Sequence, residues 1–184
     1  MQEWQKVLKA ADVAARWHVD QRRKGIAEEP YINHLLEVAM LAGEATGGLD
    51  INLVIAALLH DAIEDCEISR DKIAEMFGDD VASLVTEVTD DKRLPKAVRK
   101  DEQVRTAPIK SPRAKVLKLA DKISNLRALA ASPPSDWTAE RRTQYVGWAR
   151  QVAQGLRGVN TKLEAEFDEA ASTAEQSFRS TSAI

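Results

Sequence analysis

Four ionisable side chains fall within six residues at the end of an apolar stretch, in the segment AALLHDAIEDCE (residues 56–67). His60 and Asp61 are neighbours, and Glu64 and Asp65 follow about one turn later if the segment is helical. A His-Asp pair supplies one nitrogen and one oxygen ligand to a divalent metal ion. Two further carboxylates beside such an ion are suited to proton transfer in a hydrolytic reaction. The pattern therefore predicts a metal-dependent hydrolytic site.

Two more residues can complete the metal site. His34, one of three histidines, opens a predicted helix directly after the residues PYIN. Asp121 lies beside an apolar pair in KLADKISNL, where a carboxylate needs a partner. Together with His60 and Asp61 they give four ligands and leave positions open for water and substrate, which suits a metal of octahedral habit such as Mn²⁺.

The predicted helix over residues 51–65 would place Asp61, Glu64 and Asp65 at its carboxyl end. That end of a helix carries a partial negative charge, so three carboxylates there need a compensating cation. A bound metal ion would supply the positive charge. The alternative interpretation is that His60 and Asp61 form a satisfied polar pair at a helix end and bind nothing.

Helices are predicted to position these residues, because apolar side chains recur at helical spacing and no segment alternates over strand length. Residues 51–65 are apolar nearly all round, so this helix should lie at the centre of the domain. We expect one all-α domain over residues 1–175, a compact bundle of about eight or nine helices, and a frayed tail over residues 176–184.

Composition excludes several classes of protein. The 184 residues carry a net charge of −3 with a pI near 5.7, whereas nucleic-acid-binding proteins are more often basic over one face. The longest uncharged apolar run, residues 51–59, is too short for a membrane span of about 20 residues. Cys66 is the single cysteine, which favours a reducing compartment, and no secretory signal is expected at the amino terminus. We expect a cytoplasmic protein whose partners are neither nucleic acid nor membrane.

Five ordered segments carry a resemblance to a known family. The chain resembles the HD-domain small alarmone hydrolases, the stand-alone relatives of the SpoT hydrolase domain that include the metazoan SpoT homolog. The resemblance covers roughly residues 5–165. Leu35 and Cys66 depart from it, because proline and threonine are expected there, but neither is a predicted ligand. The matching segments are QRRKGIAEEPYINH, AALLHDAIED, VTEVTDDKRLPK, KVLKLADKISNLRAL and QYVGWARQV.

The resemblance implies an HD-type helical bundle that uses Mn²⁺ to hydrolyse the 3′-diphosphate of (p)ppGpp, giving GDP or GTP and pyrophosphate. It implies that the metal activates the attacking water. Glu64 and Asp65 would orient that water or manage its proton. The partner is thus a small nucleotide, while the oligomeric state stays open.

Four residues are candidates for substrate binding. Arg23 and Lys24 lie in the segment that resembles the family's substrate loop, which implies contact with phosphate or base; a solvated helix end is the alternative. Asn125 lies one turn after Asp121 on the same predicted face. Tyr145 is either a core residue or a phenol that reaches a phosphate or ribose.

Other polar residues carry weaker expectations. Lys96, Arg141 and Arg142 are weaker candidates for substrate contact, because exposed basic residues are common. His18 lies on the apolar face of the first predicted helix, so we expect a structural role. Cys66 has no histidine arrangement that would make it a nucleophile, so we expect it to pack.

Two alternative functions remain open. The same pocket would also accept another nucleotide with a ribose phosphate, such as NADPH, and remove that phosphate. The protein would otherwise be a nucleotide-binding sensor without turnover. The intact HDAIED segment and the complete set of four ligands favour an enzyme over a sensor.

Overall fold

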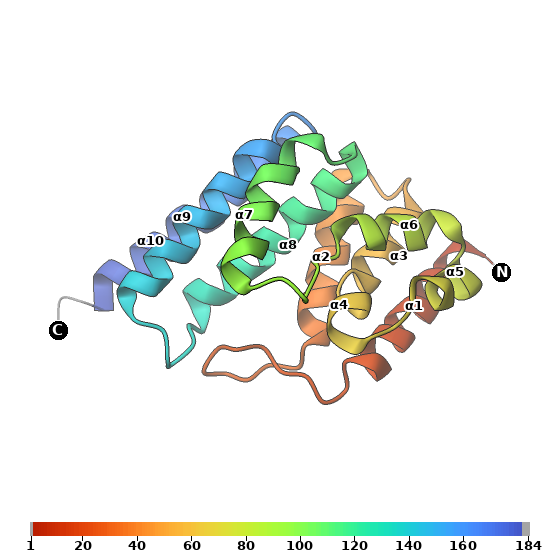
Figure 1. The fold of residues 1–184 in the computed structure, drawn as a ribbon, viewed down its shortest axis with the longest axis horizontal. Helices are drawn as coiled ribbons and strands as arrows, with labels where there is room; N and C mark the ends of the chain where they lie inside the picture. The colour runs from red at the N-terminus through yellow and green to blue at the C-terminus, as the bar shows by residue number, and fades with distance from the viewer. Residues whose placement is uncertain (1, 182–184) are drawn as a thin grey trace.

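Helix α8 (Pro112–Ala131) runs through the middle of the molecule, between helices of the amino-terminal and carboxyl-terminal parts of the chain (Figure 1). It packs against α2 (Ile32–Ala45) on one side and against α9 (Ala139–Leu156) and α10 (Thr161–Thr181) on the other. Most of its length is buried. A polar side chain on α8 can therefore meet side chains from either part of the chain.

The computed structural model describes residues 2–181, with the side chains of residues 2–178, and its regular structure is helical throughout this range. The predicted all-α single domain is confirmed. None of the described helices is long and apolar enough to cross a membrane. The other helices are α1 (Glu3–Trp17), α3 (Ile51–Leu59), α4 (Ala62–Cys66), α5 (Arg70–Phe77), α6 (Asp79–Val88), α7 (Lys96–Thr106) and the 3-10 helix η1 (Ala107–Ile109).

The predicted helix over residues 51–65 is in fact two helices. It stops at Leu59 and a new one begins at Ala62. The His60 ring contributes to the break, because its Nδ1 lies 2.8 Å from the Ala57 carbonyl oxygen, which a continuing helix would use for its own ladder. Glu64 and Asp65 consequently lie in the first turn of α4. The prediction that they sit at a carboxyl helix end was wrong.

The predicted centre of the domain is confirmed, since α3 buries most of its residues. It packs on α1, α2 and α6. At the other end of the chain α10 continues to Thr181 and includes residues 176–181 of the predicted tail. Residues 182–184 of the predicted tail lie outside the described residues.

The segment between α1 and α2, residues 18–31, forms a loop whose two sides are hydrogen-bonded to each other. The loop rests against the end of α8. Hydrogen bonds from the Arg23 amide to the Glu29 carbonyl (2.8 Å) and from the Tyr31 amide to the Gln21 carbonyl (3.1 Å) join its two sides. Its tip lies so close to the chain after α8 that a Cβ on Gly25 would stand 2.0 Å from the carbonyl oxygen of Ser132. Glycine is therefore required there, and the basic run before it is held beside α8.

Candidate metal centre and active site

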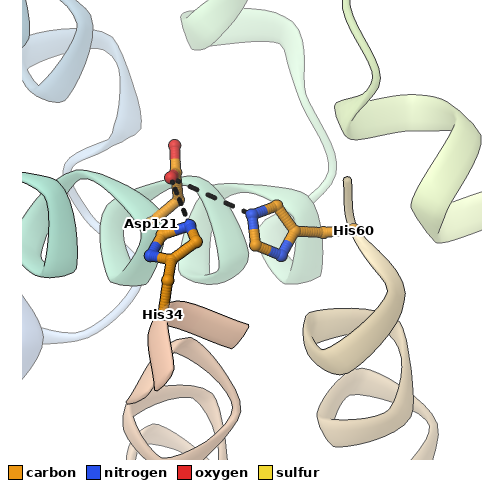
Figure 2. A group of neighbouring side chains, drawn as sticks. All are labelled: His34, His60 and Asp121. Carbon is orange, nitrogen blue, oxygen red and sulfur yellow. Dashed lines mark ion pairs between the residues drawn. The ribbon is translucent and has the colours of Figure 1, made fainter. Parts of the chain in front are cut away.

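Three helices deliver side chains to one point in the interior. His34 comes from the first turn of α2, His60 follows the end of α3, and Asp121 comes from the middle of α8. Figure 2 shows the two imidazole rings and the carboxylate turned toward one another. Each residue offers one ligand atom, and these atoms lie within 4.8 Å of one another. This spacing suits three ligands of a single metal ion.

Asp61, the fourth predicted ligand, stands beside this group at the N-cap of α4. Its Oδ2 lies 3.1 Å from His60 Nε2 and 3.7 Å from His34 Nε2. Asp121 Oδ1 lies 3.5 Å from His34 Nε2 and 3.9 Å from His60 Nε2. The structure thus brings together all four predicted ligands, two nitrogens and two carboxylates.

Hydrogen bonds behind His34 fix which ring nitrogen carries the proton. Ser124 Oγ donates to Glu37 Oε2 at 2.6 Å, because a carboxylate can only accept. The same hydroxyl lies 2.8 Å from His34 Nδ1 and must therefore accept the proton of that nitrogen. Arg127 holds the other oxygen of Glu37 at 3.1 Å. His34 Nε2 is left with a free lone pair directed at the cluster, as a metal ligand requires.

His60 is arranged in the same way by a backbone group. Its Nδ1 can only donate to the Ala57 carbonyl, so Nε2 is the nitrogen that faces the carboxylates and that can bind either a proton or a metal ion. His60 is 6% exposed, and its Nε2 has no hydrogen-bond partner among the described residues. An orphaned buried nitrogen facing two carboxylates is the feature that a bound cation would satisfy. The donor set therefore fits a divalent metal ion.

The electrostatics of the cluster point the same way. Burial opposes the charged form of His60, but the carboxylates of Asp61 and Asp121 outweigh it and raise its pKa to about 9. Burial lowers the pKa of His34. Although burial alone would raise it, the pKa of Asp121 lies well below its usual range, chiefly through Lys122 and His34. The carboxylates that stabilise a proton on His60 Nε2 would also stabilise a metal cation at this position.

Asp61 is held by a residue that the sequence reasoning missed. The Tyr31 hydroxyl donates to Asp61 Oδ2 at 2.6 Å. Burial and the Asp61 carboxylate raise the pKa of this phenol, so it stays a proton donor. The His18 ring stacks on Tyr31 at a centroid distance of 5.2 Å and its Nδ1 lies 2.7 Å from Gln21 Oε1, consistent with the structural role expected for His18. The position of Tyr31 three residues before His34 was the available signal.

Asp121 is held by its own helix. Asn125 Nδ2 donates to Oδ1 at 2.6 Å, and Lys122 Nζ donates to Oδ2 at 2.8 Å. The predicted proximity of Asn125 to Asp121 is confirmed. In this structure the side-chain amide of Asn125 orients the Asp121 carboxylate, and Asn125 also lines the adjoining cavity.

Glu64 and Asp65 lie on the wall of that cavity, and cations from the following segment hold both. Arg99 Nη1 donates to Glu64 Oε1 at 3.2 Å, and Lys92 Nζ donates to Asp65 Oδ1 at 2.5 Å. Burial raises the pKa of Glu64, and the carboxylates of Asp90 and Asp61 raise it further. A carboxyl group with a raised pKa beside a metal site is suited to proton transfer near neutral pH.

The cavity has a volume of about 820 Å³ and reaches from the metal cluster to a rim of cations and aromatic rings. Lys96 has no carboxylate within ion-pair distance among the described residues. Burial and neighbouring cations lower the pKa of Lys96 and Lys100. At Lys96 and Lys100 the rim therefore carries positive charge that no carboxylate among the described residues pairs with. The cationic lining is Arg22, Arg23, Lys24, Lys92, Lys96, Arg99, Lys100, Lys118, Lys122 and Arg141, and the aromatic lining is Tyr31, Trp137, Tyr145 and Trp148.

Comparison with known proteins agrees with this geometry. The model of the HD domain family matches residues 10–153. The guanosine-3′,5′-bis(diphosphate) 3′-pyrophosphohydrolase of Homo sapiens is 49% identical over 158 residues, covering 86% of this chain and 88% of that protein. The enzyme of the same name from Drosophila melanogaster is 45% identical over 164 residues, covering 89% and 92%. A solved metazoan ortholog of SpoT that hydrolyzes ppGpp superposes with a TM-score of 0.86 at 42% identity, covering 97% of both chains.

The chain belongs to the HD domain family, among the SpoT-like alarmone hydrolases. A second solved structure, a protein of Listeria monocytogenes, has a TM-score of 0.64 at 30% identity and covers 79% of this chain and 99% of that chain. HD-domain proteins are metal-dependent phosphohydrolases, and the His-His-Asp group described above is where this member can hold a divalent ion.

All four predicted substrate residues of this HD-domain protein line the cavity. Arg23 donates to the Ser124 carbonyl at 3.3 Å, which holds its guanidinium next to the metal cluster. Lys24 is exposed at the rim. Tyr145 stands between Trp137 and Trp148, at centroid distances of 5.5 and 5.4 Å. The question of whether Tyr145 is core or site thus has a mixed answer, since it packs and also faces the cavity.

The three weaker candidates for substrate contact do not all lie at the cavity. Lys96 and Arg141 line the cavity, whereas Arg142 does not; it bonds the Pro134 carbonyl at 3.5 Å and lies over the Phe178 ring. Sequence reasoning overlooked Arg99 and Lys100 altogether. No local signal marks them, because α7 has no buried residue and reads as a solvated helix.

Proposed function

We propose that this protein hydrolyses the 3′-diphosphate of (p)ppGpp to give GDP or GTP and pyrophosphate, with Mn²⁺ as its metal. The observation that carries the proposal is the convergence of two imidazole lone pairs and two carboxylates at one end of a cavity whose rim is cationic. The relatives that cover nearly the whole chain are named for this reaction.

The proposed metal ligands are His34, His60, Asp61 and Asp121. When bound, the ion supplies positive charge that polarises a phosphoryl oxygen and acidifies a water molecule. The protein's part is to orient the ligands. Ser124 and the Ala57 carbonyl do so for the two histidines, because each binds the Nδ1 of its ring and leaves Nε2 facing the carboxylates.

Glu64 and Asp65 handle the proton of the attacking water. Water attacks the phosphorus that carries the 3′ oxygen, and the bond between that phosphorus and the 3′ oxygen breaks. The nucleotide leaves with a 3′ hydroxyl and the two phosphates leave as pyrophosphate. The raised pKa of Glu64 suits it to take the proton from water and return it to the leaving oxygen.

The cations and rings bind the nucleotide. Arg23 is fixed beside the metal cluster, where it can neutralise the phosphate under attack. Lys24 and Lys96 stand at the rim, where their charges suit the remaining diphosphate. Tyr145 and Asn125 complete the wall between these two regions. The cavity thus offers separate places for the two phosphate groups of a 3′,5′-substituted nucleotide.

A cytoplasmic location and a small-molecule partner complete the proposal. The single thiol, Cys66, suits a reducing compartment. The net charge of −3 does not favour nucleic acid, and ten of the 26 Lys and Arg residues line the cavity.

Product analysis tests the proposed function. Purified protein is freed of metal, reloaded with Mn²⁺ or Mg²⁺, and given ppGpp, pppGpp, NADPH or GTP. We expect GDP and pyrophosphate from ppGpp, no cleavage of GTP, and the highest rate with Mn²⁺. Release of orthophosphate from ppGpp, or preferential dephosphorylation of NADPH, would contradict the alarmone reaction. Tight ppGpp binding without turnover would favour a sensor.

A further inference from the structure

Both carboxylate oxygens of Glu64 are held by one segment of the chain, residues 90–99. Arg99 Nη1 donates to Oε1 at 3.2 Å, and the backbone amide of Asp90 donates to Oε2 at 3.3 Å. The side chains of Glu64 and Arg99 are 19% and 25% exposed, so most of this ion pair is removed from water. Two donors on two oxygens define the plane of a carboxylate.

The helix that carries Glu64 cannot fix this orientation by itself. Helix α4 has five residues and buries Ala62 alone among them. Helices this short are unstable without tertiary contacts. The direction of the Glu64 carboxylate must therefore come from its partners on the facing segment.

That facing segment is itself anchored. The buried Lys118 of α8 donates to the Val88 carbonyl at 2.9 Å and lies 3.6 Å from Asp90 Oδ1. Gln103 of α7 donates to the other oxygen of Asp90. The Asp90 amide thus has a fixed place, and Arg99 is the adjustable member of the pair that holds Glu64.

Arg99 differs from the other cations of α7. Among residues 2–181 it forms an ion pair with Glu64 and with no other carboxylate. Lys96, one turn earlier, pairs with none, and Lys100 lies over the rings of Tyr145 and Trp148. Lys96 is therefore free to meet a phosphate, whereas Arg99 is already committed to the carboxylate next to the metal cluster.

We propose that Arg99 is a positioning residue that orients the Glu64 carboxylate for proton transfer, rather than a substrate contact. The proposal rests on the proposed role of Glu64 in that transfer. Without the guanidinium, the carboxylate keeps only the Asp90 amide and is free to rotate about that single bond.

Steady-state kinetics on the Mn²⁺-loaded enzyme with ppGpp tests this. Arg99→Ala should lower kcat by about 10- to 100-fold, the cost typical of a lost orienting contact, with KM changed less than about threefold. Arg99→Lys, which keeps a donor near Oε1, should recover part of the loss. Lys96→Ala should show the opposite pattern, with a raised KM and a nearly unchanged kcat.

Arg105→Ala is the matched control, because the exposed Arg105 lies on the same helix and pairs with Glu102, away from Glu64. It should leave both constants unchanged. A raised KM with unchanged kcat in Arg99→Ala would overturn the proposal and make Arg99 a substrate contact. A lowered melting temperature with no recovery in Arg99→Lys would overturn it in favour of a purely structural role.

A crystal structure of Arg99→Ala separates this inference from the proposed function. We expect the Glu64 carboxylate to leave its position or to take several, while the four metal ligands stay in place. A wild-type enzyme that does not cleave ppGpp would defeat the proposed function alone. A Glu64 carboxylate unmoved in the variant would defeat the positioning role, whatever the substrate proves to be.

Discussion

The two ends of the cavity are built by different means. At the metal end, His34 and His60 are 2% and 6% exposed, and each ring is set by a bond to its other nitrogen. At the nucleotide end, Lys24 and Lys96 are exposed and have no fixed partner among the described residues. Metal ligands are held in their orientation before the ion binds, whereas mobile cationic side chains can adapt to a flexible polyphosphate. Substitutions at the two ends should therefore fail in different ways.

The largest effect is expected at Asp121. Asp121→Ala removes the carboxylate shared by both histidines, so metal and activity should be lost together, as measured by metal analysis and ppGpp turnover. Asp71→Ala, an exposed carboxylate on α5 away from the cluster and the cavity, serves as the control. Full metal occupancy in a folded Asp121→Ala protein would remove Asp121 from the ligand set and break the contrast between the two ends.

Glu64 tests whether chemistry can be separated from metal binding at the buried end. Glu64→Ala should keep the metal and lower kcat by roughly 10²- to 10⁴-fold, as for a lost general acid–base group. Glu75→Ala, on the exposed face of α5, is the control. Intact kcat with weakened metal binding would make Glu64 a support for the metal centre.

Ser124 probes the contacts behind a ligand. Ser124→Ala takes away the acceptor of the His34 Nδ1 proton, so Mn²⁺ affinity should fall by about 10- to 100-fold, with the saturating rate largely kept. Titration calorimetry on the metal-free protein measures this. Ser172→Ala, whose hydroxyl is exposed on α10, should bind Mn²⁺ as the wild type does. Equal affinities for the two variants would show that the ring orientation does not depend on Ser124.

Sequence alone could predict the metal end of the cavity, because its polar residues stand within apolar stretches. His60 and Asp121 interrupt apolar runs, and a polar group in such a place needs a partner. The break between α3 and α4 was not predictable from periodicity, since residues on both sides stay apolar and the cause is the His60 ring bonding back to Ala57. Ser124 was missed because a hydrogen bond that it makes to another helix leaves no trace in spacing. Tyr31 lies three residues before His34, but that spacing does not show that its hydroxyl bonds Asp61.

The nucleotide end could be predicted only in part. Arg23 and Lys24 stood out through family resemblance, but charge by itself does not rank Lys96, Arg99 and Arg142. Tertiary contacts distinguish them. Lys96 has no carboxylate partner among the described residues, Arg99 pairs with Glu64, and Arg142 lies over the Phe178 ring. Helix α7 has no buried residue, so its pattern gave no indication that it closes a cavity.

Lys24 tests the nucleotide end of the cavity. Lys24→Ala should raise the KM for ppGpp by about tenfold, the effect of losing one charge-assisted hydrogen bond of roughly 1.5 kcal/mol, and should change kcat less. Metal content should not change. Lys72→Ala, an exposed lysine on α5, should behave as the wild type. A drop in kcat with constant KM would place Lys24 at the reacting phosphate.

The smallest effect is expected at Cys66, which follows Glu64 and Asp65, the two carboxylates proposed to be catalytic, and has no proposed part in the reaction. Its thiol donates to the Trp17 carbonyl at 3.3 Å and lies 3.4 Å from His18 Nε2. Burial raises the pKa of this thiol to about 11, and the nearby Asp65 carboxylate adds to the shift. The neutral form therefore dominates at neutral pH, and the thiolate appears only as the pH approaches 11.

Cys66→Thr should accordingly leave kcat/KM within about twofold and the free energy of unfolding within about 1 kcal/mol. The rate of alkylation by iodoacetamide should rise about tenfold for each pH unit between pH 7 and 9.5, because the reactive thiolate fraction grows in that proportion. A plateau below pH 9 would show a stabilised thiolate. Loss of activity on alkylation but not in Cys66→Thr would mean that bulk beside Asp65, and not the thiol, disturbs the catalytic pair.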